Sequence, residues 1–280
     1  MLHVAGDPAQ LLVPMEASRE DVELLRRQLG LDRPLPVRYL IFLGGILTGN
    51  FGRSFFSQDP ALGLVLDRLP ATLELALAGL GLALVVAIPL GSLAALKRGT
   101  LWDRGTTALA VGGQAMPAFW LGLMLIIVFS VKLRLLPVSG RDSPAHLVLP
   151  AATLASFLLP VLMRLTRSQM IEILGQDYIR TARAKGVGMA ALIFRHALRN
   201  AWIPIVTVVG LQFGRLLGGT IVTETVFAWP GAANLAVRAI RNLDYPVVQT
   251  VVILLAFSIV VVNLLTDLVV ARLDPRVRLQ

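Results

Sequence analysis

Long apolar segments separated by short polar ones make up most of the chain. A membrane-spanning helix needs about 20 mostly apolar residues. The segments that meet this requirement are 71–96, 106–131, 146–165, 200–222 and 247–271. The third carries two internal prolines, which membrane helices tolerate. The pattern therefore predicts an all-α, polytopic membrane protein with five spans.

A further apolar stretch, 35–56, is shorter and is interrupted by glycines and arginines. This predicts an interfacial or re-entrant segment rather than a span. Within 106–131, the pair Met116-Pro117 predicts a kink, because proline removes a helical hydrogen bond.

Composition supports a membrane protein. Of 280 residues, 56% are hydrophobic and 15% are charged, and the mean hydropathy is +0.74. Soluble domains usually carry about 25% charged residues. The absence of cysteine excludes disulfides and thiolate metal sites, and three scattered histidines do not suggest a metal site.

The net charge of +9 is compatible with nucleic-acid binding, but also with the excess of Lys and Arg that membrane proteins keep in cytoplasmic loops. Basic residues gather in 97–104, in 164–199 and after residue 271. Five alternating spans place all three regions on one side, which is then the cytoplasm. Topology thus explains the charge, and no nucleic-acid partner is expected.

This topology divides the chain into three parts. Residues 1–70 are expected to be extracytoplasmic, 71–272 to form the transmembrane domain with a cytoplasmic loop at 167–199, and 273–280 to form a cytoplasmic tail. Residues 1–70 have no signal peptide to carry them across the membrane. We therefore expect a first membrane helix to precede the present start.

The basic loop cannot cross the membrane, since each Arg or Lys at the bilayer centre costs about 2.5–3.5 kcal/mol. Its pattern predicts helices at 167–185 and 189–199, joined at Gly186 and Gly188. The second helix would place on one face Met189, Leu192, Ile193 and Ala197. Such a face fits the groove of a partner protein. The alternative is an amphipathic helix lying on anionic lipid.

Two motifs in this loop carry a resemblance to a known family. They are Arg180-Thr-Ala-Arg-Ala-Lys-Gly186 and His196-Ala-Leu-Arg-Asn-Ala-Trp-Ile-Pro204. They resemble the cytoplasmic "EAA" loop of ABC importer permeases, in the form typical of the dipeptide/oligopeptide/nickel group. Ala182, Gly186 and Leu198 match the general motif, whereas Arg180 and Arg199 replace its Glu and Pro.

Further stretches resemble the same group in the same order along the chain. They are Gly6-Asp-Pro-Ala9, Leu69-Pro-Ala-Thr-Leu-Glu-Leu-Ala76, Met116-Pro-Ala-Phe-Trp120, Leu136-Pro-Val-Ser-Gly140, Glu224-Thr-Val-Phe-Ala-Trp-Pro-Gly231, Asp244-Tyr-Pro-Val-Val-Gln249 and Leu273-Asp-Pro-Arg276. The resemblance implies the type I ABC importer permease fold, which has six spans, the first ending just before the Gly-Asp-Pro turn.

The resemblance also implies the partners and the setting. A second, similar permease would complete a heterodimeric pore, two cytoplasmic ATPase chains would bind ATP and Mg, and an extracytoplasmic binding protein would deliver substrate. The setting would be a bacterial or archaeal cytoplasmic membrane. This chain would be no enzyme and hold no cofactor, as it lacks the Gly-Lys dipeptide of a nucleotide-binding loop. Di- or oligopeptides are the expected substrates, with nickel and glutathione as alternatives.

Residue roles follow from the same resemblance. The residues expected to couple the chain to the ATPase are Arg180, Ala182, Arg183, Lys185, Gly186, Met189, Ile193 and Leu198. Gly186 would allow a close turn between two helices. The loop expected to face the binding protein contains Glu224, Phe227, Trp229 and Pro230.

Polar groups at membrane depth are costly and are candidates for the translocation pathway. These are Gln114, Gln212, Arg215 and Asn263, with Met116 as a metal-holding alternative. Arg215 lies among glycines that let helices approach closely, and would either face the pore or pair within the bundle. Glu74 and Asp267 lie near span ends and are expected to be structural.

Two other classes of function are compatible with a multi-pass chain. A secondary transporter would show internal repeats and carboxylates near the midplane, and the sequence shows neither. An intramembrane enzyme would need a partner base for Ser130 or Ser258, and no His or Lys lies at similar depth.

Overall fold

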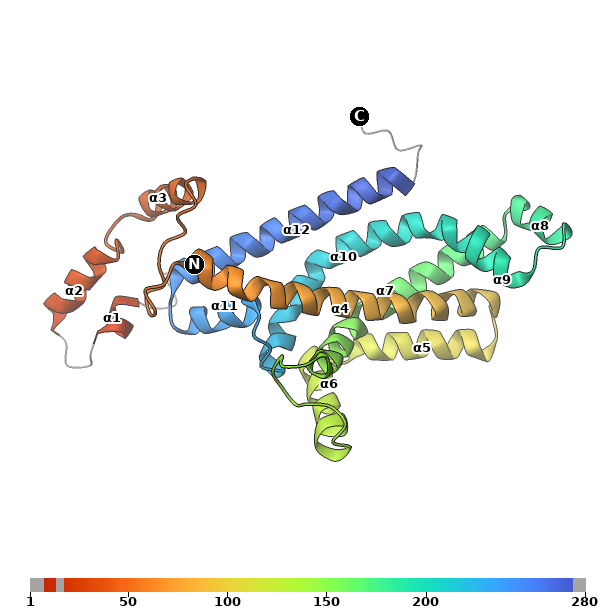
Figure 1. Ribbon diagram of the computed structural model, residues 1–280, viewed down its shortest axis with the longest axis horizontal. Helices are drawn as coiled ribbons and strands as arrows, with labels where there is room; N and C mark the ends of the chain where they lie inside the picture. The colour runs from red at the N-terminus through yellow and green to blue at the C-terminus, as the bar shows by residue number, and fades with distance from the viewer. Residues whose placement is uncertain (1–7, 14–17, 274–280) are drawn as a thin grey trace. The chain divides into compact units, whose positions relative to one another are not determined.

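The computed structural model describes residues 8–13 and 18–273, without the side chains of Leu11, Leu109, Ala110 and Gln114. The described chain is helical (Figure 1). It forms two compact units, each described by itself: unit 1 contains Met1–Thr72 and Pro230–Ala256, and unit 2 contains Leu73–Trp229 and Phe257–Gln280. The predicted tail, 273–280, lies outside the described residues except for Leu273.

Unit 1 consists of short helices and the first parts of two long helices. It contains α1 (Pro8–Leu12), α2 (Arg19–Gln28), α3 (Leu35–Leu47), α11 (Ala232–Arg241) and the first parts of α4 (Ala61–Leu96) and α12 (Tyr245–Leu273). One buried cluster joins Ala61 and Val65 to Ala232 and Val251. Residues far apart in the sequence are therefore held together by burial of apolar surface.

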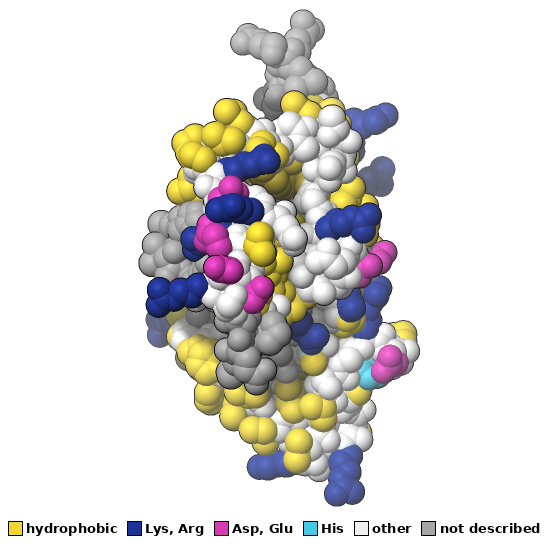
Figure 2. All heavy atoms as spheres, turned by 90° about the vertical axis from the view of Figure 1, so that its left-hand side faces the viewer, with side chains coloured by type: hydrophobic (Ala, Val, Ile, Leu, Met, Phe, Trp, Pro, Cys, Tyr) yellow, Lys and Arg dark blue, Asp and Glu magenta, His cyan; other side chains and the backbone are white. Residues whose placement is uncertain are grey.

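Helix α3 is short and apolar. Its 13 residues fall below the length of about 20 that a span needs. Most of its large side chains are exposed, with Leu47 at 88%. Figure 2 views the molecule from the left-hand side of Figure 1 and shows yellow apolar side chains beside dark blue basic ones, with the magenta acidic side chains largely gathered in one area. The segment 35–56 thus contains no spanning helix, and its interfacial position stays a prediction.

Unit 2 is built around α7 (Pro144–Leu174), which packs against α5 (Leu101–Ala115), α6 (Ala118–Leu125) and α10 (Leu198–Val226). Glycines set the closest approaches between helices. A Cβ at Gly79 would lie 2.8 Å from Leu154 Cβ, and one at Gly91 would lie 2.7 Å from the Met163 carbonyl oxygen. These α4 glycines are needed because the α7 helix lies against them.

Four predicted spans are confirmed as long apolar helices: Ala61–Leu96, Pro144–Leu174, Met189–Val226 and Tyr245–Leu273. The helix α7 contains both Pro150 and Pro160, as expected for 146–165.

The predicted span 106–131 is not one straight helix. It is broken between α5 and α6 at Met116-Pro117, and the two parts are bent by 102°. The predicted kink is confirmed, and the chain continues as the π-helical segment η2 (Ile126–Lys132). The bent pair brings the number of candidate spans to 5 if it crosses as one.

Candidate functional site

The basic segment, residues 177–199, begins with α8 (Asp177–Ala184) and continues through α9 (Met189–Ala191) and η3 (Leu192–Ala197) into α10. Figure 1 shows α8 and α9 at one end of unit 2, beyond α7 and α10. The predicted first helix, 167–185, is wrong, because α7 ends at Leu174 and Gln176 is extended. The intervening Gly175 is a poor helix former.

The predicted second helix, 189–199, also has a different end. It continues without a break into the span, so that Met189–Val226 is one run of 38 residues. The basic segment is therefore continuous with a candidate membrane-spanning helix.

Gly186 makes the turn between α8 and α9. Its φ of +80° lies in the left-handed region that favours glycine. The Gly186 N–H donates to the Arg183 carbonyl and the Val187 N–H to the Ala182 carbonyl, at 3.0 and 3.2 Å. This is a Schellman motif, and the predicted close turn at Gly186 is confirmed. Gly188 has a φ of −62°, which any residue adopts.

The apolar face of the second helix is largely used inside the chain. Leu192 and Ala197 are buried in a cluster with Ile179, Met170 and Ala95. Three expected ATPase contacts pack against this cluster and are partly buried: Ala182, Ile193 and Leu198. The expectation of a continuous free face is therefore wrong, because the ends of α4 and α7 already cover much of that face.

The exposed surface of the basic segment is different from the expected one. Phe194 is 71% exposed and Met189 is 51% exposed. Four other residues that were expected to contact the ATPase also lie on this surface and are exposed: Arg180, Arg183, Lys185 and Gly186. Sequence reasoning missed Phe194 because it lies off the helical apolar stripe, although a large aromatic beside Arg195 in a cytoplasmic loop was a usable signal.

A π-helical turn, η3, carries Phe194. Such turns are rare and often occur at functional sites. The Asn200 Nδ2 donates to the Tyr178 Oη at 2.7 Å, which ties α8 to the start of α10. The basic segment is thus held in one shape by a hydrogen bond and a buried cluster.

An ion pair joins α5 to α7 near the predicted cytoplasmic side. Arg167 donates to both carboxylate oxygens of Asp103, from Nε at 2.6 Å and from Nη2 at 2.8 Å. Asp103 lies in the predicted cytoplasmic segment 97–104. The hydrogen bond from Arg167, with a further one from the Gly99 N–H, lowers the pKa of Asp103 to about 2. The pair therefore stays ionised at neutral pH.

The candidate pathway residues do not form one cluster. Gln212 is buried at 8% exposure, whereas Arg215 and Asn263 are exposed. Met116 is also exposed and lies at the break before α6. The side chain of Gln114 lies outside the described residues.

Arg215 shares an exposed stripe of α10 with Leu211, Gly218 and Val222. A neighbouring side of α10 packs closely on α12. A Cβ at Gly210 would overlap Thr266, and one at Gly214 would touch Ile259. The expectation that glycines around Arg215 permit close helix contact is confirmed for these two.

At the other end of unit 2, the loop after α10 is built from buried side chains. Glu224 is fully buried, and Phe227 and Trp229 are 1% exposed. These three side chains therefore support the loop from within, and the position of the loop opposite a binding protein stays a prediction. Pro230 belongs to unit 1 and is half-buried.

Arg141 organises this end of unit 2. Its Nε donates to Glu74 Oε2 at 2.8 Å, and its guanidinium lies 5.9 Å from the centre of the Trp229 ring. The Gly140 N–H donates to the Phe227 carbonyl at 3.2 Å. Glu74 is thus structural, as predicted. Two motifs that are far apart in the sequence, Leu136–Gly140 and Glu224–Gly231, meet here.

Comparison with known proteins gives matches over the whole length. Residues 87–279 match the family described as "Binding-protein-dependent transport system inner membrane component", and residues 1–76 match the N-terminal part of such membrane components. The chain is 42% identical over 307 residues to the dipeptide transport system permease protein DppB of Escherichia coli K12, covering 98% of this chain and 91% of DppB. It is 42% identical over 273 residues to the glutathione transport system permease protein GsiC of the same strain, covering 98% and 89%.

Solved structures agree at the level of fold. The chain matches the inward-facing MetNI methionine ABC transporter with a TM-score of 0.64 and 20% identity, covering 75% of this chain and 96% of that one. It matches an amino acid ABC transporter with a TM-score of 0.54 and 14% identity, covering 75% and 94%.

The chain has long apolar helices, the basic segment at one end of unit 2 and the loop after α10 at the other. With the matches above, these features define a multi-pass membrane transport subunit with the ABC importer permease fold. The chain belongs to the family of inner membrane components of binding-protein-dependent transport systems. It is a permease of the inner membrane, and its family works with a substrate-binding protein and ATPase chains.

Proposed function

We propose that this chain forms one half of the pore of an ATP-driven importer of short peptides. The observation that carries the substrate is the 42% identity, over 98% of the chain, to a dipeptide permease and to a glutathione permease. Both names describe carriers of short peptides. Dipeptides or slightly longer peptides are the first candidate, and glutathione is the second because the likeness to GsiC is equally close.

The partners proposed are a second, homologous permease, two ATPase chains and an extracytoplasmic binding protein. ATP and Mg²⁺ would be held by the ATPase chains, and this chain would hold no cofactor and catalyse no reaction. The stripe Leu211, Arg215, Gly218 and Val222 is exposed on α10, which suits a surface that faces the pore or the second permease.

The basic segment would contact the ATPase chains and transmit their closure to the pore. Phe194 and Met189 offer exposed apolar surface, flanked by Arg180, Arg183 and Lys185. Since η3 runs directly into α10, a shift of this contact moves a span as a rigid lever.

The experiment compares Gly186→Ser with Gly188→Ser in the reconstituted complex of two permeases, two ATPases and binding protein. Neither added Cβ would meet an atom within 4 Å, but only residue 186 has a positive φ. A side chain there costs about 1–2 kcal/mol of backbone strain. We expect Gly186→Ser to lower peptide uptake per ATP hydrolysed.

Gly188 is the N-cap of α9, where serine is favoured, so Gly188→Ser should transport normally. Equal coupling in the two variants would contradict the lever. Failure of the complex to assemble or to import any short peptide would contradict the proposed function itself.

A further inference from the structure

The turn between α4 and α5 joins two helices that are candidates for membrane spans. Helix α4 ends at Leu96 and α5 begins at Leu101, so only residues 97–100 separate them. Helix α4 qualifies as a span, and α5 is the first half of the bent pair that can cross as one. A fully extended chain of this length spans about 14 Å at most, so the turn stays at the membrane surface. By the predicted topology, this surface is the cytoplasmic one.

Large apolar side chains are exposed at this turn. Leu101 is 83% exposed and Trp102 is 68% exposed. Leu93 and Leu96, near the end of α4, are exposed as well. Tryptophan is enriched at membrane–water interfaces, where its ring lies at the level of the lipid headgroups. The exposure of Trp102 beside the end of a candidate span therefore points to contact with lipid.

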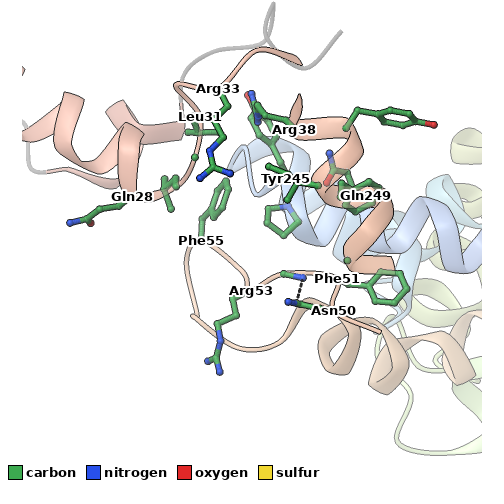
Figure 3. Close-up of a pocket in the computed structure, with 18 of the residues that line it drawn as sticks. Gln28, Leu31, Arg33, Arg38, Asn50, Phe51, Arg53, Phe55, Tyr245 and Gln249 are labelled. Atoms are coloured by element: carbon green, nitrogen blue, oxygen red, sulfur yellow. Dashed lines mark hydrogen bonds between the residues drawn. The ribbon is translucent and has the colours of Figure 1, made fainter. Parts of the chain in front are cut away.

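The cavity of unit 1 drawn in Figure 3 shows the opposite arrangement of aromatic rings and arginines. There Tyr245 is 3% exposed, and its ring meets the Phe55 ring edge to face at 6.2 Å. Arg53 points away from the cavity and donates to the Gln58 carbonyl at 2.9 Å. The chain itself covers the Tyr245 ring, whereas it leaves most of Trp102 open.

Three exposed basic side chains flank Leu101 and Trp102, namely Lys97, Arg98 and Arg104. The Lys97 Nζ lies 5.1 Å from the centre of the Trp102 ring, within the range of a cation–π interaction. Among the described residues, neither Arg98 nor Arg104 forms an ion pair. The turn therefore carries positive charge directly beside its apolar side chains.

The single acid of 97–104 is already engaged inside the chain. Asp103 is buried and accepts two hydrogen bonds from the Arg167 guanidinium. The Gly99 N–H also donates to Asp103 Oδ2 at 2.9 Å, and Gly99 has a φ of +80°. Asp103 therefore fixes the shape of the turn, and it is not free to attract a cationic partner.

We propose that this turn binds anionic phospholipid of the cytoplasmic leaflet. Lys97, Arg98 and Arg104 attract the headgroup phosphate, while Leu101 and Trp102 enter the boundary between headgroups and acyl chains. Guanidinium groups match phosphate through paired hydrogen bonds. Each Lys or Arg close to an anionic leaflet raises the affinity about fivefold.

The test measures quenching of Trp102 fluorescence in the full chain, held in phosphatidylcholine vesicles. Brominated phosphatidylglycerol or brominated phosphatidylcholine is added in increasing amounts, because bromine on an acyl chain quenches a tryptophan that it touches. Trp102→Phe, a change at an exposed position, supplies the signal of the other tryptophans, which is subtracted. We expect the anionic lipid to reach half of the quenching at a lipid fraction about tenfold lower or less.

The variant arm compares two pairs of substitutions that remove the same charge. Arg98→Gln with Arg104→Gln should reduce the preference for the anionic lipid at least about fivefold. Arg180→Gln with Arg183→Gln also removes two exposed arginines from the predicted cytoplasmic side, but outside this turn, and should keep the preference. All four positions are exposed, so the substitutions remove little from the fold.

Four results would overturn the proposal. In the unaltered chain, these are equal quenching by the two lipids, no quenching by either, or loss of the preference on adding inorganic phosphate at constant ionic strength. The fourth is an equal loss of preference in the two pairs of variants, which would show a general effect of charge.

The ATPase chain is the other partner that could cover this turn. If Arg98→Gln with Arg104→Gln releases the ATPase chains from the complex and keeps the lipid preference, the surface belongs to the ATPase and the proposal is overturned. The quenching test needs neither substrate nor ATP. A negative result therefore leaves the proposed importer intact, and a complex that imports no peptide leaves the lipid site intact.

Discussion

In the spans of unit 2, α4, α7, α10 and α12 approach one another at glycines, whereas the basic segment packs on the ends of these helices through the larger side chains of Ile179 and Leu192. The first kind of contact depends on the absence of a side chain, and the second on burying one. Inside the bilayer the lipid is as apolar as leucine, so close packing must supply the attraction. In contact with water, burial of apolar surface supplies it.

The largest expected effect comes from filling a glycine contact. A Cβ at residue 91 would lie 2.7 Å from the Met163 carbonyl oxygen and 3.2 Å from the Arg167 nitrogen, both backbone atoms of α7. Gly91→Val therefore forces α4 and α7 apart and should lower the free energy of unfolding by about 1–3 kcal/mol. The measurement is the Tm of the purified protein in detergent.

Gly81→Val is the matched control on the same helix, since no heavy atom lies within 4 Å of its Cβ position. We expect nearly the wild-type Tm from it. If the two variants lose equal stability, glycine contacts do not distinguish the spans from the basic segment, and the comparison fails.

These two regions also differ in how far the sequence predicted them. Hydropathy placed four spans, because segment length and apolar content are the quantities the bilayer selects. Single residues placed two other features. Pro117 predicted the kink beside Met116, because proline removes a helical hydrogen bond, and Gly186 predicted the turn, since only glycine adopts that φ readily.

The sequence did not predict which apolar side chains of the basic segment remain free. Helical periodicity assigned Leu192 and Ala197 to a docking face, but a periodic stripe does not tell a partner protein from the chain's own α4 and α7. Local pattern carries no information on such contacts.

An intermediate effect is expected from the exposed surface of the basic segment. Phe194 is 71% exposed, so Phe194→Ser removes little from the fold. If the Phe194 side chain packs into the interface with the ATPase chain, the variant should lose about 2 kcal/mol of the free energy with which permease and ATPase bind, the scale of an interface hot spot. The amount of ATPase chain retained on the purified permease measures this loss.

Phe56→Ser is the control, because Phe56 is also an exposed phenylalanine but lies in the predicted extracytoplasmic region. Equal retention of ATPase by the two variants would show that the free apolar surface of the basic segment is not where the partner binds.

The smallest effect is expected at the ion pair that joins α5 to α7. Lysine at residue 167 keeps the charge but loses the two-bond geometry that Arg167 makes with Asp103, so Arg167→Lys should lower the Tm less than Gly91→Val does. Arg164→Lys, an exposed change on the same helix, is the control.

The same ion pair predicts how stability depends on pH. Because pairing lowers the pKa of Asp103 from 3.8 to about 2, its stabilising effect is complete at pH values above the ordinary pKa of an aspartate, and it is lost only as the pH falls towards 2. The Tm difference between wild type and Arg167→Lys should therefore be constant from about pH 5 to pH 8, where the carboxylate is charged in both folded and unfolded chains. A difference that shrinks within that interval would mean that another titrating group, and not the Asp103 carboxylate, controls the contact between α5 and α7.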